Sequence, residues 1–190
     1  MSSPEPGHSP STGADTDRRA MVLASAMATF ARFGYRKTSM EEVARAARIS
    51  RPGLYFLFSS KEALFRAAVD QALTRDLEAA EQALAGTDRP LRERLAEAFD
   101  HWTARYIGPL TSDVAAVIEA NPDLLGDTAR TAPQRFEALI TDAIAAESGP
   151  KPAAAIAQTL ISTSIGLKHQ VASRDAYLAR LKTAIDLLLP

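Results

Sequence analysis

The chain of 190 residues has no cysteine, three histidines and one tryptophan. The absence of cysteine excludes disulfide bridges, thiolate metal sites and a catalytic thiol. No apolar run approaches the roughly 20 residues that a membrane-spanning helix needs. Ser, Pro and Gly fill the N-terminal stretch where a signal peptide would carry its apolar segment. These absences predict a soluble, cytoplasmic protein.

Motifs of known enzyme classes are also missing. The sequence has no glycine-rich phosphate loop, no HExxH and no GxSxG. His8, His101 and His169 are far apart in the sequence. His101 can pair with Glu97 or Asp100 on one helix, but such pairs are common on protein surfaces and do not indicate catalysis. We therefore expect no enzymatic activity, no metal site and no cofactor.

Positive charge is concentrated near the N-terminus, although the whole chain has a net charge of only −1. Residues 18–66 carry eight Arg and two Lys against three Glu, a net charge of +7. The flanking segments are acidic, with −3 over residues 1–17 and −5 over residues 67–190. This asymmetry indicates a polyanionic partner for the first part of the chain. Chance clustering of solvated arginines is the alternative.

After a stretch with almost no apolar residues, the sequence is helical nearly throughout. Alanine is abundant, β-branched alternation is absent, and Gly and Pro fall mainly between stretches with apolar residues every three or four positions. We expect a disordered tail over residues 1–16 and an all-α fold of about nine helices, with Pro133 kinking or dividing one of them. The expected ranges are 17–33, 39–47, 51–58, 60–85, 90–107, 110–120, 124–147, 152–171 and 175–189.

Capping signals mark the starts of the first helices. Ser39–Glu42 and Ser59–Glu62 both fit the capping-box pattern. Ser50 is expected to cap the third helix, and Asp15 or Asp17 the first. The order of a helix, a short helix, a three-residue turn, a second short helix and a long helix is the outline of a helix-turn-helix domain.

Conspicuous short motifs lie at fixed spacing between residues 33 and 65. They are Phe33-Gly34, Thr38-Ser39, Val43-Ala44, Ile49-Ser50, Gly53-Leu54-Tyr55, Phe58 and Ser60-Lys61-Glu62. This pattern closely resembles the DNA-binding domain of the tetracycline-repressor (TetR) family of transcriptional regulators. The resemblance implies a helix-turn-helix domain over residues 17–65, followed by a helical effector-binding and dimerisation domain over residues 66–190.

Two positions depart from the family pattern. Arg48 stands in the turn where many members have Gly, and a positive φ at that position would cost an arginine on the order of 1 kcal/mol. Leu57 stands where members often carry a His or Tyr that touches a phosphate, so one contact with the DNA backbone would be absent.

The third helix is short enough to enter a major groove and bring its first side chains to base edges. Arg51 is suited to a bidentate bond to guanine, and hydroxyls at helix starts suit a phosphate. For Phe56, packing in the core is an equal alternative, and the serines would cap their helices with or without DNA. The expected DNA contacts are Thr38, Ser39, Ser50, Arg51, Pro52, Gly53, Tyr55, Phe56 and Lys61.

An effector pocket and a dimer interface are expected in the second part of the chain. The candidate pocket residues are Phe99, Trp102, Tyr106, Phe136 and His169, with filling of the core as the alternative for Trp102 and Tyr106. The resemblance implies a homodimer that pairs the last two helices of each subunit. The candidate interface residues are Ile156, Leu160, Ile165, Leu167, Leu178, Leu181, Ile185 and Leu188.

The sequence thus predicts a ligand-responsive transcriptional repressor in the bacterial cytoplasm. It would bind a palindromic, double-stranded DNA operator as a homodimer, and a small-molecule effector would release it. An all-helical adaptor whose basic module binds an acidic protein is the alternative. The two differ in salt dependence, because binding to many phosphates weakens steeply as salt rises.

Overall fold

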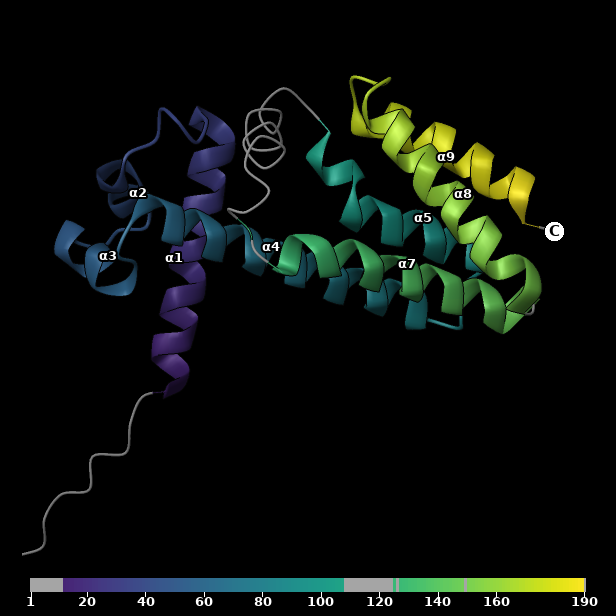
Figure 1. The fold of residues 1–190 in the computed structure, drawn as a ribbon, viewed down its shortest axis with the longest axis horizontal. Coiled ribbons are helices and arrows are strands. Elements are labelled where there is room, and N and C mark those ends of the chain that lie inside the picture. Colours follow the sequence, from purple (N-terminus) through teal and green to yellow (C-terminus); the bar gives the residue numbers. More distant parts are fainter. Residues whose placement is uncertain (1–11, 108–124, 126, 149, 190) are drawn as a thin grey trace, which may run out of the picture.

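The computed structural model describes residues 12–107, 125, 127–148 and 150–189 (Figure 1). Within these ranges the chain forms α-helices and one short 3-10 helix, η1, and no strand. The predicted all-α class is confirmed, whereas the helix expected over 110–120 lies outside the described residues. The elements are α1 (Thr12–Phe33), α2 (Met40–Ala46), α3 (Arg51–Leu57), α4 (Lys61–Ala85), α5 (Leu91–Trp102), η1 (Ala104–Tyr106), α7 (Asp127–Ser148), α8 (Pro150–Lys168) and α9 (Arg174–Leu188).

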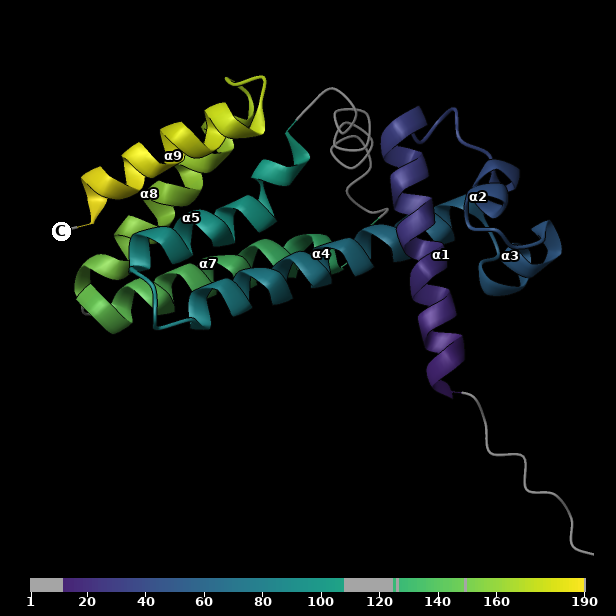
Figure 2. The same cartoon turned by 180° about the vertical axis from the view of Figure 1, so that it is seen from behind.

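The helices form two groups that share α4. Helices α1, α2 and α3 gather around the start of α4 (Figures 1 and 2). Helices α5 and α7 pack beside the remainder of α4, α8 packs on α7, and α9 packs on α5 and α8. Buried residues of α4 join the first core as far as Val69 and the second core from Leu77 onward. Between them, the half-buried Leu73 packs against both cores. The cores thus meet inside α4, several residues beyond the domain boundary expected at residue 65.

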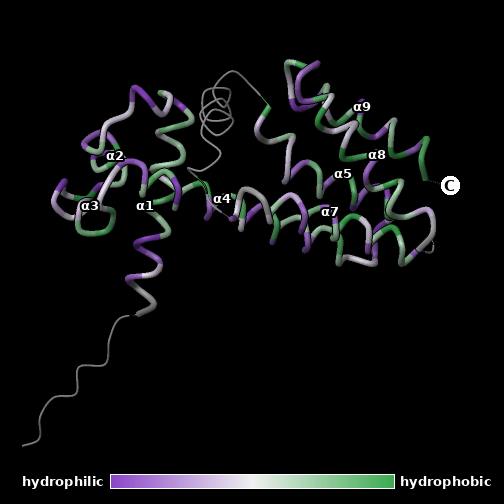
Figure 3. The backbone as a smooth tube through the Cα atoms, in the orientation of Figure 1, coloured by the Kyte–Doolittle hydropathy of each residue, from purple (hydrophilic) through white to green (hydrophobic). Residues whose placement is uncertain are grey.

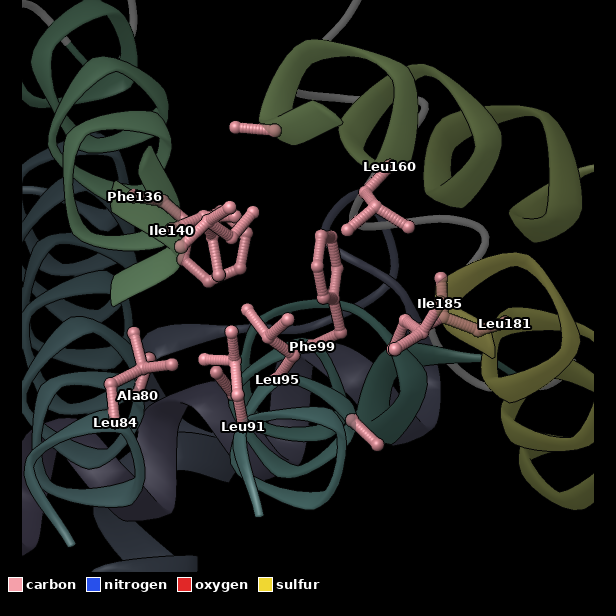
Figure 4. Packing of buried hydrophobic residues seen from close by; sticks show 14 of the residues in the cluster. Ala80, Leu84, Leu91, Leu95, Phe99, Phe136, Ile140, Leu160, Leu181 and Ile185 are labelled. Atoms are coloured by element: carbon pink, nitrogen blue, oxygen red, sulfur yellow. The ribbon is translucent and has the colours of Figure 1, made fainter. Parts of the chain in front are cut away.

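The second core surrounds α5. Figure 4 shows Leu91, Leu95 and Phe99 of α5 directed toward side chains from α4, α7, α8 and α9. All three are buried. This packing explains why α7 is continuous through Pro133, since Phe136 and the apolar residues after it hold the helix in the core on the C-terminal side of the proline. Of the two effects expected of Pro133, a kink or a division of the helix, the division does not occur.

The N-terminal boundary also differs from expectation. Helix α1 begins at Thr12, so residues 12–16 are helical and not part of a tail, and neither Asp15 nor Asp17 is its N-cap. Asp15 lies in the first turn, where an acidic side chain interacts favourably with the helix dipole. Hydrophilic residues dominate this first part of α1 (Figure 3). The rest of the expected tail, residues 1–11, lies outside the described residues.

The other helix boundaries differ from the expected ranges by a few residues. Helix α5 ends at Trp102, and η1 follows it where one helix to residue 107 was expected. At α4 the N-cap is Ser60, whose Oγ accepts a hydrogen bond from Ala63 N at 3.1 Å. The capping box expected between Ser59 and Glu62 is therefore wrong, because the helix begins one residue later. None of the described helices combines the length and apolar character needed to cross a membrane.

Candidate nucleic-acid interface

The turn between α2 and α3 is closed by backbone hydrogen bonds. Ile49 N donates to Ala44 O at 3.0 Å, and Arg48 N donates to Arg45 O at 3.2 Å, the two bonds of a Schellman motif. This motif needs a left-handed residue after the helix, and Arg48 has φ 55°. The sequence analysis considered a positive φ at Arg48 as a condition, and the structure has it. The turn fixes the direction in which α3 leaves α2.

Helix α3 is held by its cap and by two buried side chains. Ser50 Oγ accepts a hydrogen bond from Gly53 N at 3.1 Å, as its capping role predicted. A Cβ at Gly53 would lie 3.0 Å from the same Oγ, so glycine fits the space beside the cap. Leu54 and Phe58 are buried in the first core. The rotation of α3 about its axis is thereby set.

The outward face of α3 carries four residues predicted to contact DNA. Arg51 and Pro52 are exposed, Tyr55 is 43% exposed and Phe56 is 90% exposed. The Arg51 guanidinium carbon lies 5.7 Å from the centroid of the Tyr55 ring. Phe56 therefore points to solvent, and the alternative that it packs in the core is wrong.

Arg19 of α1 holds the other end of α3. Its Nη1 donates to the Leu57 carbonyl oxygen at 3.2 Å, and its guanidinium carbon lies 4.3 Å from the centroid of the Phe58 ring. A cation at a helix C-terminus is favoured by the helix dipole. Arg19 thus clamps α1 to the end of α3.

Lys61 is directed into the domain. Its Nζ donates to Tyr35 O at 3.1 Å and to Thr38 O at 3.2 Å, and lies 4.5 Å from the centroid of the Tyr35 ring. Two of its three N–H groups are thus engaged in joining α4 to the turn after α1. The neighbouring Glu62 accepts a hydrogen bond from Tyr35 Oη at 3.3 Å. Burial, followed by the charge of Glu62, raises the pKa of Tyr35.

Thr38 and Ser39, both predicted to bind phosphate, differ in accessibility. Thr38 is 2% exposed, and its hydroxyl donates to Gly34 O at 2.7 Å. Because this hydroxyl is buried and engaged, the expectation that the Thr38 side chain touches a phosphate is wrong. Ser39 is exposed, and it forms the predicted capping box with Glu42. Hydrogen bonds from the Ser39 amide and then from its hydroxyl lower the pKa of Glu42.

The five candidate pocket residues do not come together. Phe99 and Phe136 are buried, and the Phe136 ring packs against Phe99 at 5.1 Å and against Trp102 at 4.8 Å between centroids. These three rings fill the core, which was the stated alternative for Trp102 but not for Phe99 and Phe136. His169 is exposed near the end of α8, so its assignment to a common pocket is wrong.

Tyr106 lines a different hollow, of about 210 Å³, between α1 and α4. Its hydroxyl donates a hydrogen bond to the buried carboxylate of Asp76. The sequence analysis missed the other lining residues because most of them are apolar side chains on two helices, and nothing in the sequence shows that these two faces lie opposite each other. They are Leu23, Ala24, Met27, Ala28, Ala68, Gln71, Ala72 and Arg75.

The candidate dimer residues divide between the core and the surface. Leu160, Leu167, Leu181 and Ile185 are buried within the subunit, so their assignment to an interface is wrong. They pack against α5 and its neighbours. Ile156, Leu178 and Leu188 are half-buried, whereas Ile165 is 58% exposed. Leu187, which the sequence analysis did not select, is 81% exposed.

No cluster of three or more His, Asp or Glu side chains suited to a metal ion occurs among the described residues.

The candidate site is the exposed face of α3, together with the exposed basic residues of the first domain. Arg36, Lys37, Arg45 and Arg48 are all exposed there.

Known proteins match this chain most clearly in the domain that carries α3. Residues 22–68 match the family model described as bacterial regulatory proteins of the tetR family. The transcriptional regulator RutR of Escherichia coli K12 is 38% identical over 56 residues, which are 30% of this chain and 26% of RutR. YfiR of Bacillus subtilis, described as an uncharacterised HTH-type transcriptional regulator, is 29% identical over 125 residues, 65% of this chain and 51% of YfiR.

Solved structures extend the likeness over nearly the whole chain. A candidate TetR-family regulator from Mesorhizobium loti superposes with a TM-score of 0.73 at 18% identity, covering 91% of this chain and 95% of that one. A TetR regulator from Legionella pneumophila gives a TM-score of 0.70 at 17% identity, with coverage of 92% and 97%. At these identities the likeness establishes the fold. The sequence match is much shorter than the structural match, since the aligned part of the chain spans only about a quarter of the length of RutR.

Proposed function

Because the chain is a member of the TetR family through residues 22–68, we propose that it regulates transcription by placing α3 in the major groove of an operator. The observation that carries this proposal is the outward face of α3, on which Arg51, Pro52, Tyr55 and Phe56 are all exposed. The cap, the buried anchors and the Arg19 clamp fix this face, and a rigid helix of this length fits the groove.

The charge around α3 supports a nucleic acid as the partner. The net charge of +7 over residues 18–66 lies in the domain that presents α3. The exposed Arg36, Lys37, Arg45 and Arg48 are available for phosphates, and Ser39 and Ser50 remain candidates beside them. Contacts of this kind position a protein on duplex DNA, whereas Arg51 would read the sequence through guanine O6 and N7.

We propose a homodimer because one short helix makes too few base contacts for selectivity. The exposed faces of α8 and α9, which lie side by side away from α3 (Figures 1 and 2), supply a surface for a second copy. Ile165 and Leu187 are its large apolar residues, and smaller exposed residues allow close approach of the helices. These smaller residues are Ala155, Thr159, Ser162, Ala176, Ala179 and Thr183. A two-fold dimer would read a palindrome with half-sites about 34 Å apart.

Repression relieved by a small effector requires coupling between the two parts of the chain. Helix α4 belongs to both cores, so a ligand that changes the packing of α4 would change the placement of α3. The hollow between α1 and α4 offers such a contact, and its volume of about 210 Å³ limits the effector to a small molecule. Couplings of this kind are typically 1–3 kcal/mol.

Selection from a pool of random duplexes tests the proposal. The full chain should enrich a palindromic sequence, and its affinity should fall linearly with salt on logarithmic axes. Arg51→Ala should lose preference for guanine at one position of each half-site. Arg135→Ala, which removes an exposed arginine from α7, is the matched control and should bind as the wild type does. Absence of any enriched duplex, with retained binding to acidic proteins, would instead favour the adaptor.

A further inference from the structure

The outward face of α3 has two sides of different chemistry. Arg51 and Tyr55 are four residues apart and therefore neighbours along the helix, and they form one polar strip. Pro52 and Phe56 are also four residues apart and form an apolar strip. With 3.6 residues per turn, the strips are separated by about 100° around the helix axis. They would therefore meet different base edges in a groove.

The apolar strip is unusually exposed. At 90%, Phe56 is more exposed than any other large apolar side chain in the part of the chain that the structure describes. The neighbouring Leu54 is fully buried and Phe58 is 4% exposed, so the rotation of α3 directs Phe56 outward. Because Leu54 and Phe58 anchor the helix, the ring is presented at a defined place.

A major groove offers one apolar group on its base edges, the 5-methyl group of thymine. The other edge atoms are hydrogen-bond donors or acceptors, which a phenylalanine ring cannot satisfy. Phenylalanine against this methyl group is a known form of base contact. Pro52, which has no backbone N–H and lies one helical turn before Phe56, adds exposed apolar surface on the same strip.

We propose that Phe56 is a specificity-determining residue that reads thymine methyl groups in the half-site, beside the guanine read by Arg51. This inference rests on the proposed function, since it assumes that α3 enters the major groove. It assigns each half-site a thymine next to the Phe56 strip and a guanine next to the Arg51 strip.

The experiment replaces single thymines by uracil in the duplex that the full-length protein selects from a random pool. Uracil lacks only the methyl group, so base pairing and backbone are kept. At the thymine touched by Phe56, the substitution should weaken wild-type binding about fourfold per half-site, the factor expected for one methyl-sized apolar group. Substitution in both half-sites should weaken it about fifteenfold.

Two variants assign the effect to this ring. Phe56→Ala should bind the thymine and uracil duplexes equally, and folding should be retained because the ring is exposed. Met21→Ala is the matched control, because it shortens an exposed apolar side chain on α1, and it should keep the wild-type ratio between the two duplexes.

The outcomes separate this inference from the function on which it rests. If the protein selects a palindrome but no uracil substitution changes its affinity, or if Phe56→Ala keeps the wild-type ratio, the inference is overturned and the proposed function stands. If Phe56→Ala weakens binding to every duplex by the same factor, the inference is also overturned, because the ring would then contact the DNA backbone and not a thymine methyl group. A protein that selects no duplex overturns both.

Discussion

Lys61 and Tyr35 interact twice: Lys61 Nζ donates a hydrogen bond to the Tyr35 carbonyl oxygen at 3.1 Å, and the same ammonium lies 4.5 Å from the centroid of the Tyr35 ring. The pair joins the first turn of α4 to the turn after α1. The ring of Tyr35 in turn packs against Phe30 and Phe65, so the ammonium is anchored to the aromatic centre of the first core.

We expect Lys61→Met to lower the free energy of unfolding by about 1–3 kcal/mol, because it leaves two backbone carbonyls without their donor. Urea unfolding measures this loss. Lys37→Met, which removes an exposed lysine from the same domain, should leave the unfolding midpoint nearly unchanged. If Lys61→Met keeps full stability but lowers the salt dependence of DNA binding, Lys61 is a phosphate contact, and the internal role proposed here is wrong.

Replacement of Arg48 by glycine should stabilise the protein. The left-handed backbone at φ 55° costs an L-residue roughly 1–2 kcal/mol, part of which the greater chain entropy of unfolded glycine offsets. We expect Arg48→Gly to gain about 0.5–1 kcal/mol in denaturant unfolding. Arg45→Gly, in the last turn of α2, is the matched control and should lose about 1 kcal/mol. A loss of stability in Arg48→Gly would mean that the arginine side chain contributes more than its backbone costs.

Tyr177→Phe should make the protein less sensitive to high pH. The buried Tyr177 hydroxyl lies 2.6 Å from Ser164 Oγ, and burial raises the pKa of Tyr177 above its ordinary value of 10.0. A raised pKa means that the unfolded chain ionises first, so this contribution to stability is present below pH 10 and is lost as the pH rises further.

We therefore expect wild-type stability to fall above pH 10, and Tyr177→Phe to fall less steeply. At neutral pH the variant should be less stable by about 1 kcal/mol, the typical value of one hydrogen bond. Thermal unfolding between pH 7 and 11 measures both effects. Identical alkaline slopes for the two proteins would contradict the role assigned to this hydroxyl.

Ile165→Arg and Leu187→Arg should each convert the proposed dimer into a folded monomer. Both side chains are exposed in the subunit, so folding should survive, but charges facing their own symmetry mates on a two-fold interface repel each other. Sedimentation velocity measures the mass and circular dichroism measures the helix content. Ala138→Arg, on an exposed position of α7, is a control that should leave the mass unchanged. If the wild type is monomeric, the proposed interface is wrong.

Features set by neighbouring residues were predictable from the sequence. The caps at Ser39 and Ser50 depend on contacts within three residues, and the structure has them as expected. The left-handed Arg48, which the sequence raised only as a condition, also depends on contacts within five residues. The cap of α4 was missed by one residue because Ser59 and Ser60 are consecutive and serine suits an N-cap at either position, whereas the structure uses Ser60.

Features set by packing between distant segments were not predictable. The inward direction of Lys61 depends on carbonyls 23 and 26 residues earlier in the chain. Helices α8 and α9 are apolar on more than one side, so spacing alone did not show that Leu160 faces α5 while Ile165 faces solvent. The aromatic residues Phe99, Trp102 and Phe136 likewise have the composition of a pocket, but they pack on one another: Trp102 stacks on Phe136, and Phe99 meets Phe136 edge to face.

The passage of α4 from one core to the other at Leu73 has a mechanical consequence. Between Val69 and Leu77 the helix rises about 12 Å. Within this stretch of α4, Leu73 is the residue that packs against both cores. A bend of α4 there disturbs far fewer apolar contacts than a bend within either core. Two other contacts connect the same parts of the chain: Leu125, which lies just before α7, is buried in the first core, and Tyr106 donates a hydrogen bond to Asp76 within this stretch of α4. A change in the bend of α4 would therefore act on α3 together with these contacts.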